Sequence, residues 1–562
     1  MVATQRVTTA SLDFDQDVPR DNGKVYLVGA GIASLAAAAF MIRDGDKRGS
    51  DITILEESGA VGGALDGTGN PVAGYVLRGG RMLESKYLCT FDLFASIPTL
   101  DDRTTVTQEI FDWNTTMKTS SRSRLFAHGQ RMTAPEFGLR EKDILTIERL
   151  AIEPEGFIGR TSIADHFEPE FFRSGFWLMW CTTFAFQPWH SAIEFKRYLL
   201  RFSHMVSGFN RLEGIMRTVY NQYDSMVRPL HKWLIEHGVV FQLGTKVTNL
   251  HFDEEDDART IDGIEYVRDG IAGRMTVAAD DYVLVTLGSM TEGSSFGSMH
   301  TAPERLGKRD GGAWTLWETI AQGRPDFGNP SVFADHVDQS KWTSFTVTLS
   351  DPELLNFVRD ATGNMPGEGG LITFPHSSWL ASIVIPHQPH FIRQPEDISV
   401  FWGYGLSIDA PGDFVKKPMS ACTGEEILTE IMGHLHVATQ TEIVDHVRLS
   451  NRTAHILRHA NCIPCLMPFI TSQFMPRHHG DRPDVVPRGA RNFAFIGQYC
   501  EMPDDTVFTV EYSVRSAQTA VYTLLGLRRT PPPVYKGAFD ARVLLKAYKA
   551  MHDIDGSALA AV

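Results

Sequence analysis

Apolar runs separated by a glycine-rich turn predict the first elements of the chain. The run Val25–Val28 predicts a buried strand, and it leads through Gly29-Ala30-Gly31-Ile32-Ala33-Ser34 into an alanine-rich helix. A second apolar run, Ile52–Leu55, predicts another strand, and Glu56 ends it. Strand, glycine turn, helix and strand in this order are typical of a βαβ unit with a parallel sheet.

The same patterns continue along the chain and predict a mixed α/β protein. Residues 143–221 read as mainly helical, and residues 314–477 mix strand and helix patterns. Shorter elements are predicted as strands at 239–243, 282–289 and 492–497 and as helices at 220–234 and 508–525.

One stretch within the helical part, Ser174–Ile193, carries no charge over twenty residues, which is the length of a membrane span. Gln187, Pro188 and His190 interrupt it, and aromatic residues occur throughout. These features favour a buried, aromatic-lined helical segment over a spanning one, and such a surface suits a long apolar ligand. Transient membrane contact to collect lipid stays open as an alternative.

The first glycine turn predicts a dinucleotide site. Glycines allow backbone N–H groups to approach a pyrophosphate, and the helix N-terminus that follows supplies partial positive charge. Glu56 stands where an acid can accept hydrogen bonds from ribose hydroxyls. Ser34 replaces the third glycine of the usual pattern, so ordinary helix–strand packing remains the alternative.

The segment after Glu56 favours a flavin over a nicotinamide. Its sequence, Glu56-Glu57-Ser58-Gly59-Ala60-Val61-Gly62-Gly63, resembles the acid followed by Gly-Gly of many FAD enzymes, where the glycine pair lies against the diphosphate. A simple loop is the alternative reading. The late strand, Gly497 and the helix after it fit the closing unit of such enzymes. No second fingerprint of this quality is found, so no separate NAD(P)H site is expected.

The chain has 562 residues, too many for one hydrophobic core, so several domains are expected. The fold class is α/β: a discontinuous FAD-binding Rossmann-like domain with an inserted mixed α/β substrate domain and a helical segment. The predicted boundaries are a mobile N-terminal arm at 1–23, FAD-binding parts at 24–135, 228–300 and 480–528, a mainly helical substrate-lining region at 136–227, a substrate-binding domain at 301–479 and a C-terminal helical tail at 529–562.

Composition and charge narrow the class of partner. Hydrophobic residues make up 43% and charged residues 22%, as in an ordinary globular enzyme. A net charge of −15 argues against nucleic acid as a partner. The first 23 residues contain Asp13, Asp15 and Asp17 and no apolar core, so no signal peptide is expected and a cytoplasmic location is predicted, with peripheral membrane contact as the alternative.

Six cysteines in a chain of this length do not indicate a disulfide framework. Cys462 and Cys465 form a single CxxC, and no second pair of ligands completes a zinc site, so no metal is expected. A redox-active pair is one interpretation, and incidental thiols in a buried segment are the favoured one.

Blocks along most of the chain, from about residue 24 to 550, resemble the oleate hydratases, once called myosin-cross-reactive antigens. They occur in the order of that family, which makes the resemblance specific. The blocks are Val28–Ala33, Gly63–Gly67, Arg78–Arg81, Glu194–Tyr198, Tyr220–Tyr223, Gly288–Glu292, Gln388–Phe391 and Gly480–Pro483. The resemblance implies an enzyme that binds FAD and adds water to the cis double bond of unsaturated fatty acids, turning oleic acid into a 10-hydroxy fatty acid without net oxidation.

The resemblance also implies roles for individual residues. Tyr198 matches the proposed proton donor, although from the residues alone a core tyrosine would be the preferred interpretation. Gln222 and His390 match the groups that bind the substrate carboxylate. Two further head-group positions fall on Val384 and Pro386, which cannot serve, and His387 is the nearest replacement. The expected cofactor-binding residues are Gly29, Gly31, Ala33, Ser34, Glu56, Gly62, Gly63, Arg81, Met82, Val247, Ser289 and Gly497.

The largest departure from the family lies beside the expected flavin. The family reads Arg-Gly-Gly-Arg-Glu-Met, with the glutamate as proposed water activator, and this chain has Met82 at that position. A thioether cannot take a proton from water. Either Glu84 or a flavin or backbone group replaces the carboxylate, or the activity is altered.

Three functions are therefore compared, with an unsaturated fatty acid and water as the expected partners and a monomer or homodimer as the expected state. The hydratase would couple protonation by Tyr198 to attack by water, because a phenol is too weak an acid to protonate an alkene in a separate step. A redox flavoenzyme of the amine oxidase or desaturase type shares the nucleotide fingerprint. A flavin- and lipid-binding protein without catalysis is the third interpretation, and Met82 prompts it.

Overall fold

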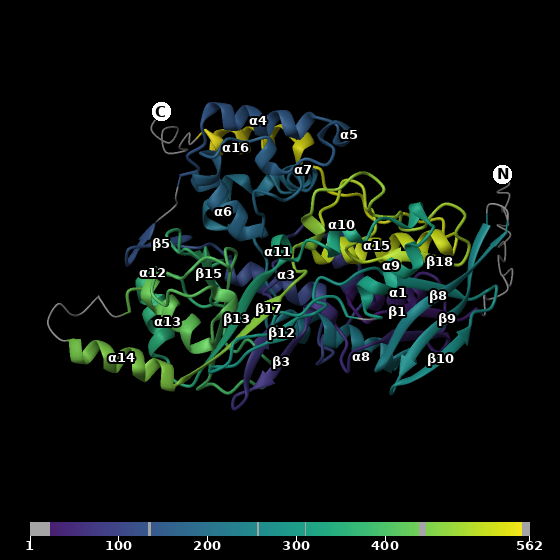
Figure 1. Ribbon diagram of the computed structural model, residues 1–562, viewed down its shortest axis with the longest axis horizontal. Helices are drawn as coiled ribbons and strands as arrows, with labels where there is room; N and C mark the ends of the chain where they lie inside the picture. Colours follow the sequence, from purple (N-terminus) through teal and green to yellow (C-terminus); the bar gives the residue numbers. More distant parts are fainter. Residues whose placement is uncertain (1–22, 133–135, 256–257, 310, 438–445, 553–562) are drawn as a thin grey trace, which may run out of the picture.

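The computed structural model describes residues 23–132, 136–255, 258–309, 311–437 and 446–552. The predicted N-terminal arm lies outside these residues apart from residue 23, and so does the end of the predicted C-terminal tail from residue 553. Figure 1 shows three parts: a parallel sheet with its helices, a second sheet beside it, and a layer of helices above the junction of the two.

A five-stranded sheet, parallel throughout, forms the first part, in the order β18-β11-β1-β2-β7. Each strand is short and mostly apolar, as expected for strands buried on both faces. The strands are β1 (Val25–Val28), β2 (Ile52–Glu56), β7 (Val240–Leu243), β11 (Tyr282–Thr286) and β18 (Phe493–Ile496). The sequence placed all five correctly to within a few residues, and β18 and β11 return to β1 from more than 250 residues away.

Helices α1 (Ile32–Arg43) and α15 (Val510–Leu524) pack against each other beside this sheet. The alanines at 36–39 in α1 are buried, and their small side chains allow the helix to lie close to its neighbours. Further helices around the sheet are α2 (Leu88–Phe94), α3 (Val106–Met117), α8 (Arg228–Glu236) and α9 (Ala313–Ala321). The predicted helix at 220–234 begins instead with a π-helical turn at Tyr223–Val227, which leads into α8.

An antiparallel three-stranded sheet joins this part, in the order β10-β9-β8. Its strands are β8 (Thr245–Glu255), β9 (Ala258–Arg268) and β10 (Ile271–Thr276). The strand β8 begins close to β2, so it brings Val247 to the end of the parallel sheet.

The second large sheet has eight strands in the order β12-β17-β13-β16-β15-β14-β5-β6. Only the β14–β5 pair is parallel. Its strands are β5 (Leu125–Ala127), β6 (Gln130–Met132), β12 (Ser295–Phe296), β13 (Trp342–Leu349), β14 (Ile372–Thr373), β15 (Ala381–Val384), β16 (Ser399–Gly405) and β17 (Ala460–Met467). The predicted boundaries at 135 and 300 therefore need correction, because β5, β6 and β12 pair with strands of this sheet rather than with the parallel one.

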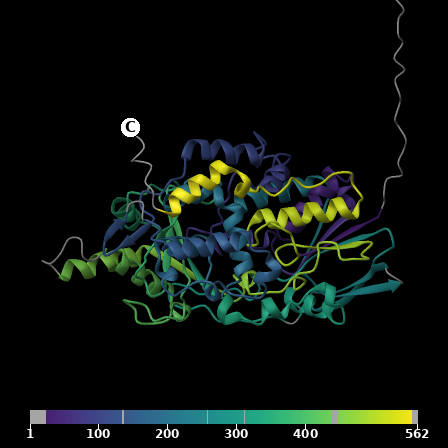
Figure 2. The same ribbon diagram turned by 90° about the horizontal axis from the view of Figure 1, so that it is seen from above.

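The central strand β13 of this sheet is buried on both faces, because other elements pack against each of them. Phe345 and Val347 pack into a core with α12 (Glu353–Thr362) and α13 (Gly424–His434). On the opposite face the hydroxyls of Thr346 and Thr348 accept hydrogen bonds from backbone N–H groups of β4 (Gly74–Leu77), which pairs with β3 (Gly67–Asn70). Helix α14 (His446–Arg458) extends from the far end of this part (Figures 1 and 2).

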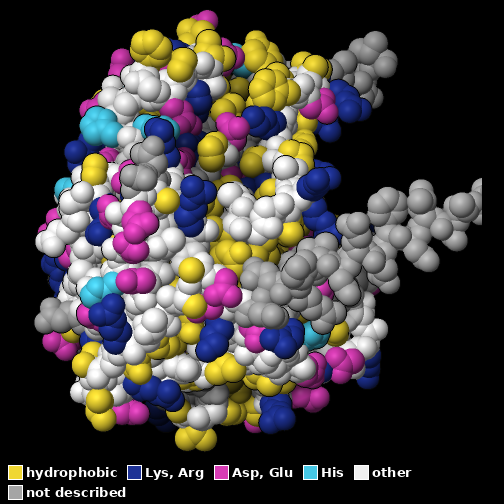
Figure 3. Space-filling model, turned by 90° about the vertical axis from the view of Figure 1, so that its right-hand side faces the viewer, with side chains coloured by type: hydrophobic (Ala, Val, Ile, Leu, Met, Phe, Trp, Pro, Cys, Tyr) yellow, Lys and Arg dark blue, Asp and Glu magenta, His cyan; other side chains and the backbone are white. Residues whose placement is uncertain are grey.

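The described residues of the segment 136–227 belong mainly to a layer of helices. It contains α4 (Glu141–Ile152), α5 (Glu155–Ile158), α6 (Gly175–Phe184), α7 (Ala192–Arg201) and, from the C-terminal region, α16 (Ala541–Met551). Two short helices, α10 (Ser331–Ala334) and α11 (Val337–Ser340), lie in a connecting segment. Figure 3 shows the molecule hollowed between this upper layer and the body below, with hydrophobic side chains gathered over the top.

The uncharged stretch at 174–193 ends its helix after ten residues, at Phe184, and continues as a loop into α7. Trp177, Met179 and Trp180 in α6 are buried. Among the described residues, none of the helices combines the length and the apolar character that a membrane crossing requires.

Candidate active site

A cleft of about 760 Å³ opens at the carboxyl ends of β1, β11 and β18. This is the edge at which open parallel sheets place their ligands. Ten of the twelve residues predicted to bind a cofactor line it: Gly29, Gly31, Ala33, Glu56, Gly62, Gly63, Arg81, Val247, Ser289 and Gly497. The two others, Ser34 and Met82, do not. The Ser34 side chain is buried and shares a hydrogen bond of 3.2 Å with the Thr286 hydroxyl, and Met82 lies in the wall of a neighbouring cavity.

The two glycine turns at the mouth of the cleft are bound to each other. The Gly62 N–H donates to the Ala30 carbonyl at 2.8 Å, and a Cβ on Gly63 would approach the Gly31 Cα to 3.0 Å. Gly29 and Gly62 have φ values of +89° and +112°, which side chains disfavour. A Cβ on Gly31, in contrast, would meet nothing within 4 Å, because that face of the turn looks into the open cleft. The turns thus form a backbone cradle of the kind that a diphosphate requires.

Glu56 ends β2 as predicted and holds the first glycine turn and the start of the loop that leads to the second. Its Oε2 accepts from the Ala30 N–H at 2.7 Å, and its Oε1 accepts from the Ser58 N–H at 2.8 Å. A carboxylate has about four acceptor positions, so two remain for ribose hydroxyls.

Tyr198 lies in a second cavity of about 100 Å³, next to the cleft. The wall is largely apolar and aromatic, and includes Phe184, Phe202, Trp402 and Tyr404. The Tyr198 side chain is buried, and its hydroxyl donates to the Val507 carbonyl at 2.6 Å. Burial raises the pKa of this phenol well above its usual value, and Tyr87, Glu194 and Asp505 add to the rise. The hydroxyl therefore carries its proton over the whole ordinary pH range.

Helix α7 holds Tyr198 through buried ion pairs on the same helical face. Glu194 accepts from Arg477 at 3.0 Å and from Arg482 at 2.8 Å. Arg197 pairs with Glu501 at 2.8 Å. Burial alone would raise the pKa of Glu194, but the neighbouring arginines outweigh it and lower that pKa to about 2. The tyrosine is thus tied to the segment 477–507, which returns from the end of the parallel sheet.

Met82 and Glu84 line the same cavity as Tyr198. The Glu84 carboxylate is buried, with one oxygen 2.8 Å from Arg201 Nη1 and the other 2.8 Å from the Lys86 N–H. Burial by itself raises the pKa of Glu84, but His204 and Arg201 outweigh it, and the pKa is lowered. A carboxylate paired in this way is a weak proton acceptor. The geometry therefore argues against the prediction that Glu84 replaces the missing base.

A third, small cavity of about 40 Å³ contains all three predicted head-group residues, Gln222, His387 and His390. The Gln222 amide donates to the Arg81 carbonyl at 3.1 Å, and its oxygen has no partner among the described residues. Burial, followed by Arg217 and His387, lowers the pKa of His390 to about 3. Burial also lowers the pKa of His387. Both imidazoles are therefore neutral at pH 7.

The three spaces adjoin one another, and the cleft shares Leu65 and Asp66 with the third cavity. The second and third cavities share the wall formed by Gly79, Gly80, Arg217, Val384 and Trp402. Arg81 lines all three spaces, with its guanidinium 5.0 Å from the Phe508 ring centroid. A cofactor in the cleft would thus lie next to both a chain beside Tyr198 and a polar head group next to Gln222.

Sequence reasoning missed Arg217, Trp402 and Trp113, which line the third cavity. No local motif marks them, because they come from segments separated by 100 to 300 residues and meet only in the fold. The unpartnered indole N–H of Trp402 lies near Gly80, where a Cβ would approach it to 3.0 Å. The glycine pair at 79–80 therefore leaves room for this indole.

The six cysteines are free and buried. Cys462 and Cys465 lie on β17, and burial raises the pKa of the Cys465 thiol to about 12. This supports incidental thiols over a redox-active pair.

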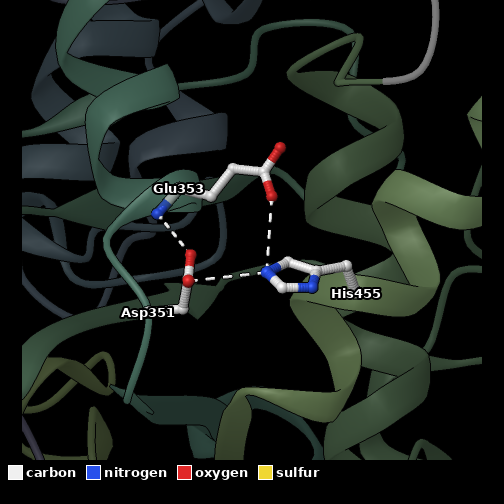
Figure 4. Close-up of side chains that lie close together, drawn as sticks. All are labelled: Asp351, Glu353 and His455. Carbon is white, nitrogen blue, oxygen red and sulfur yellow. Dashed lines mark hydrogen bonds and ion pairs between the residues drawn. The ribbon is translucent and has the colours of Figure 1, made fainter.

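Within the part of the chain that the structure describes, two groups of side chains outside these cavities have the donor types of a cation site. Figure 4 shows Asp351, Glu353 and His455 turned toward one another, with His455 Nε2 3.4 Å from Asp351 and 3.7 Å from Glu353. Arg452 already pairs with Glu353 at 2.7 Å. In the other group, Glu430 accepts three backbone N–H groups. Both groups have internal partners, and the expectation of no metal stays a prediction.

The chain is similar in sequence to members of a known protein family and similar in fold to solved structures. A model of the MCRA family matches residues 22–522. The chain is 38% identical over 545 residues to "Oleate hydratase" of Streptococcus pyogenes serotype M49, covering 95% of this chain and 90% of the relative. It is 33% identical over 569 residues to "Linoleate hydratase" of Lactiplantibacillus plantarum, covering 94% and 98%. The solved structure of cyclohexylamine oxidase from Brevibacterium oxydans superposes with a TM-score of 0.50 at 13% identity, covering 90% of this chain and 100% of that one, which shows a shared fold and confirms the predicted class.

Proposed function

This chain belongs to the MCRA family, and we propose that it is a hydratase that adds water to the cis double bond of unsaturated fatty acids, converting oleic acid into 10-hydroxystearic acid. One observation carries the proposal in the structure: Tyr198, whose hydroxyl is buried, lines an apolar cavity that adjoins both a dinucleotide cleft and a small polar cavity. An amphipathic chain with one reactive position in its middle matches this arrangement.

The residues of the cleft fit FAD. The open face of Gly31, the paired glycine turns and the free acceptor positions of Glu56 suit a diphosphate and a ribose. The groups that would hold FAD are the ten predicted residues that line the cleft. Bound FAD would supply a pocket wall and electrostatic stabilisation of developing positive charge, with no net redox change.

Tyr198 would donate the proton to the alkene carbon while water attacks the neighbouring carbon. The phenol is a weak acid, and burial makes it weaker, so the two events have to be coupled. The same high pKa favours the return of a proton to the phenolate, since overall one proton leaves Tyr198 and one comes from the water. The aromatic wall excludes other water and so limits side reactions.

Met82 leaves the water without the carboxylate that the family pattern provides. In the described structure the polar groups that line this cavity include hydroxyls, backbone carbonyls, cations and the ion-paired Glu84. Water would therefore be held by hydrogen bonds and activated as the bond forms, with Tyr198 as the final proton acceptor.

Transient membrane contact, a cytoplasmic location and the choice between monomer and homodimer stay predictions. Helix α16 supports membrane contact, because Leu544, Leu545 and Tyr548 are exposed on it beside Lys546 and Lys549. The helix belongs to the upper layer, over which hydrophobic side chains gather in Figure 3.

The proposal is tested by incubating FAD-loaded protein with oleate in air and identifying the product by mass spectrometry. A product heavier by one water, with the flavin spectrum unchanged after turnover, is expected. Flavin bleaching with peroxide formation would instead establish a redox enzyme. Binding of oleate without any product would establish a lipid-binding protein that has lost catalysis.

A further inference from the structure

The Arg217 side chain carries a positive charge that no carboxylate of the described residues neutralises. It lies between Met216 and Thr218 in the wall shared by the Tyr198 cavity and the third cavity. Its guanidinium makes one hydrogen bond, from Nη2 to the Gly370 carbonyl at 3.3 Å, and its buried Nε has no partner among the described residues. No carboxylate of the described residues pairs with it, and burial alone lowers its pKa, to about 10, so the charge persists at neutral pH.

Arg124 is a buried arginine that finds most of its acceptors within this protein. Its Nε also has no partner among the described residues and it has no carboxylate partner, but its guanidinium donates to Thr373, Thr182, Thr183 and two backbone carbonyls, whereas Arg217 is half-buried. Arg217 has no such set of acceptors. A charge that is largely removed from water and lacks a counter-ion is destabilising, so a ligand that supplies the missing anion is favoured at this position.

The backbone at Arg217 is held in place independently of its side chain. Asn114 bonds the N–H and the carbonyl of residue 217, at 2.9 and 2.7 Å. The guanidinium is therefore presented to the cavity by a fixed segment and is not a surface side chain folded inward. Such preorganisation lowers the entropic cost of binding.

Most of the other polar groups of the third cavity are neutral, and the acid that lines it, Asp66, pairs with Arg78 at 2.9 Å. His387 and His390 carry no charge at pH 7, and Gln222 and Trp402 contribute uncharged hydrogen-bonding groups. Arg81 is the second cation nearby, but it also lines the dinucleotide cleft, where a diphosphate can neutralise it. Arg217 does not line the cleft. An anion that neutralises Arg217 therefore has to come from the third cavity or from the cavity beside Tyr198.

We propose that Arg217 binds the carboxylate of the fatty acid and so sets both the charge preference and the direction of the chain. The inference rests on the proposed function and deepens it. The carboxylate lies in the third cavity with Arg217, Gln222 and His390, and the acyl chain passes Gly79 and Gly80 toward Tyr198. Val384 and Pro386 line the same cavity and offer no side-chain donor. The guanidinium of Arg217 therefore provides most of the head-group recognition.

The test compares oleate with oleyl alcohol, which has the same chain and no charge. Dissociation constants are measured from tryptophan fluorescence for the FAD-loaded wild type, Arg217→Met, Arg217→Lys and the control Arg211→Gln, which removes an exposed cation six residues earlier. Arg217→Met should weaken oleate binding by about 10–100-fold, the range for a lost charge-assisted hydrogen bond, and leave oleyl alcohol nearly unchanged. Arg217→Lys should fall between, because lysine keeps the charge and loses the fork.

A second measurement separates binding from folding. Methionine replaces an uncompensated buried cation with an apolar chain of similar length, so the ligand-free Arg217→Met variant should unfold at an unchanged or higher temperature. The stabilisation of the wild type by oleate should be absent in it. If Arg217→Met does not fold, the assignment of an uncompensated charge is wrong.

Two results would overturn the proposals separately. Wild-type protein that hydrates oleate, together with an Arg217→Met variant that binds oleate as tightly, would remove Arg217 and leave the hydratase function intact. Equal losses for oleate and oleyl alcohol would also remove the carboxylate role. Tight oleate binding that depends on Arg217 in a protein that yields no hydration product would keep the head-group site and remove the hydratase function.

Discussion

The dinucleotide cleft and the cavity beside Tyr198 adjoin each other, yet they are built from different material. The cleft is mostly backbone: two glycine turns joined by a hydrogen bond between Gly62 and Ala30. The cavity is mostly side chains, and α7, which carries Tyr198, is held by ion pairs with distant segments. A backbone site tolerates variation of most side chains, whereas a side-chain site depends on each partner. The two regions should therefore fail in different ways when single residues are changed.

The largest effect is expected on the cavity side, in Tyr198→Phe. The ring packing is kept and only the hydroxyl is lost, so the Val507 carbonyl loses one donor at a cost of about 1 kcal/mol and the protein should fold and retain FAD. Hydration of oleate should fall by roughly 10²–10⁴-fold, the range for a lost general acid. The measurement is product formation per FAD-loaded molecule.

Tyr404→Phe is the matched control, because Tyr404 lines the same cavity and its buried hydroxyl also bonds a backbone carbonyl, that of Thr182. Its loss should reduce hydration by less than about tenfold. Full activity in Tyr198→Phe would remove the tyrosine from the chemical step, and equal losses in both variants would reduce its role to packing.

On the cleft side, Gly31→Val should leave the fold intact and impair the cofactor. A Cβ at position 31 meets no protein atom within 4 Å, and the side chain projects into the space that a diphosphate would fill. FAD binding should weaken by about 10–100-fold, the usual cost of overpacking. Equilibrium dialysis against FAD measures it. The control is Gly156→Val, at an exposed glycine on α5 that also has open space and lies outside the cleft; FAD affinity equal in both variants would contradict the assignment of the turn.

This difference in material explains what the sequence could predict. The strands of the parallel sheet, both glycine turns and Glu56 follow from residues adjacent in the chain, and ten of twelve predicted cleft residues lie there. The exceptions depend on neighbours from elsewhere: Ser34 bonds Thr286, 252 residues away. The cavity residues Tyr198, Gln222 and His390 were identified through family resemblance alone. Arg217 and Trp402 had no signal, because an unpaired charge becomes visible only when its surroundings are known.

The third prediction concerns Met82 and Glu84, which line the cavity beside Tyr198. If the missing carboxylate limits the reaction, Met82→Glu should raise the rate of hydration by about tenfold or more. Glu84→Gln should act on stability instead, because it leaves Arg201 with Asp505, 3.7 Å away, as its remaining acidic partner. A loss of about 3 kcal/mol in the free energy of unfolding is expected.

Thermal unfolding and activity per folded molecule separate these two effects. A folded Glu84→Gln protein that has lost activity a hundredfold, combined with no gain in Met82→Glu, would show that Glu84 is the base despite its ion pair. The reverse pattern would assign Glu84 to the support of α7 through Arg201.

The smallest effect is expected in the acid dependence of stability, and it again belongs to the cavity side. Burial raises the pKa of Glu194 and its arginine partners lower it, with the net result a fall from 4.5 to about 2 in the folded protein. A group with a depressed folded pKa stabilises the protein above its unfolded pKa, and this contribution is lost as the pH falls toward the folded value. The contribution is about 3 kcal/mol, and it should disappear between about pH 5 and about pH 2. Urea unfolding at several pH values measures the slope. Glu194→Gln should flatten it, whereas the exposed Glu148→Gln on α4 should not. If Glu194→Gln left the slope unchanged, the ion pairs around Glu194 would not be what holds α7, and with it Tyr198, to the segment that returns from the cleft.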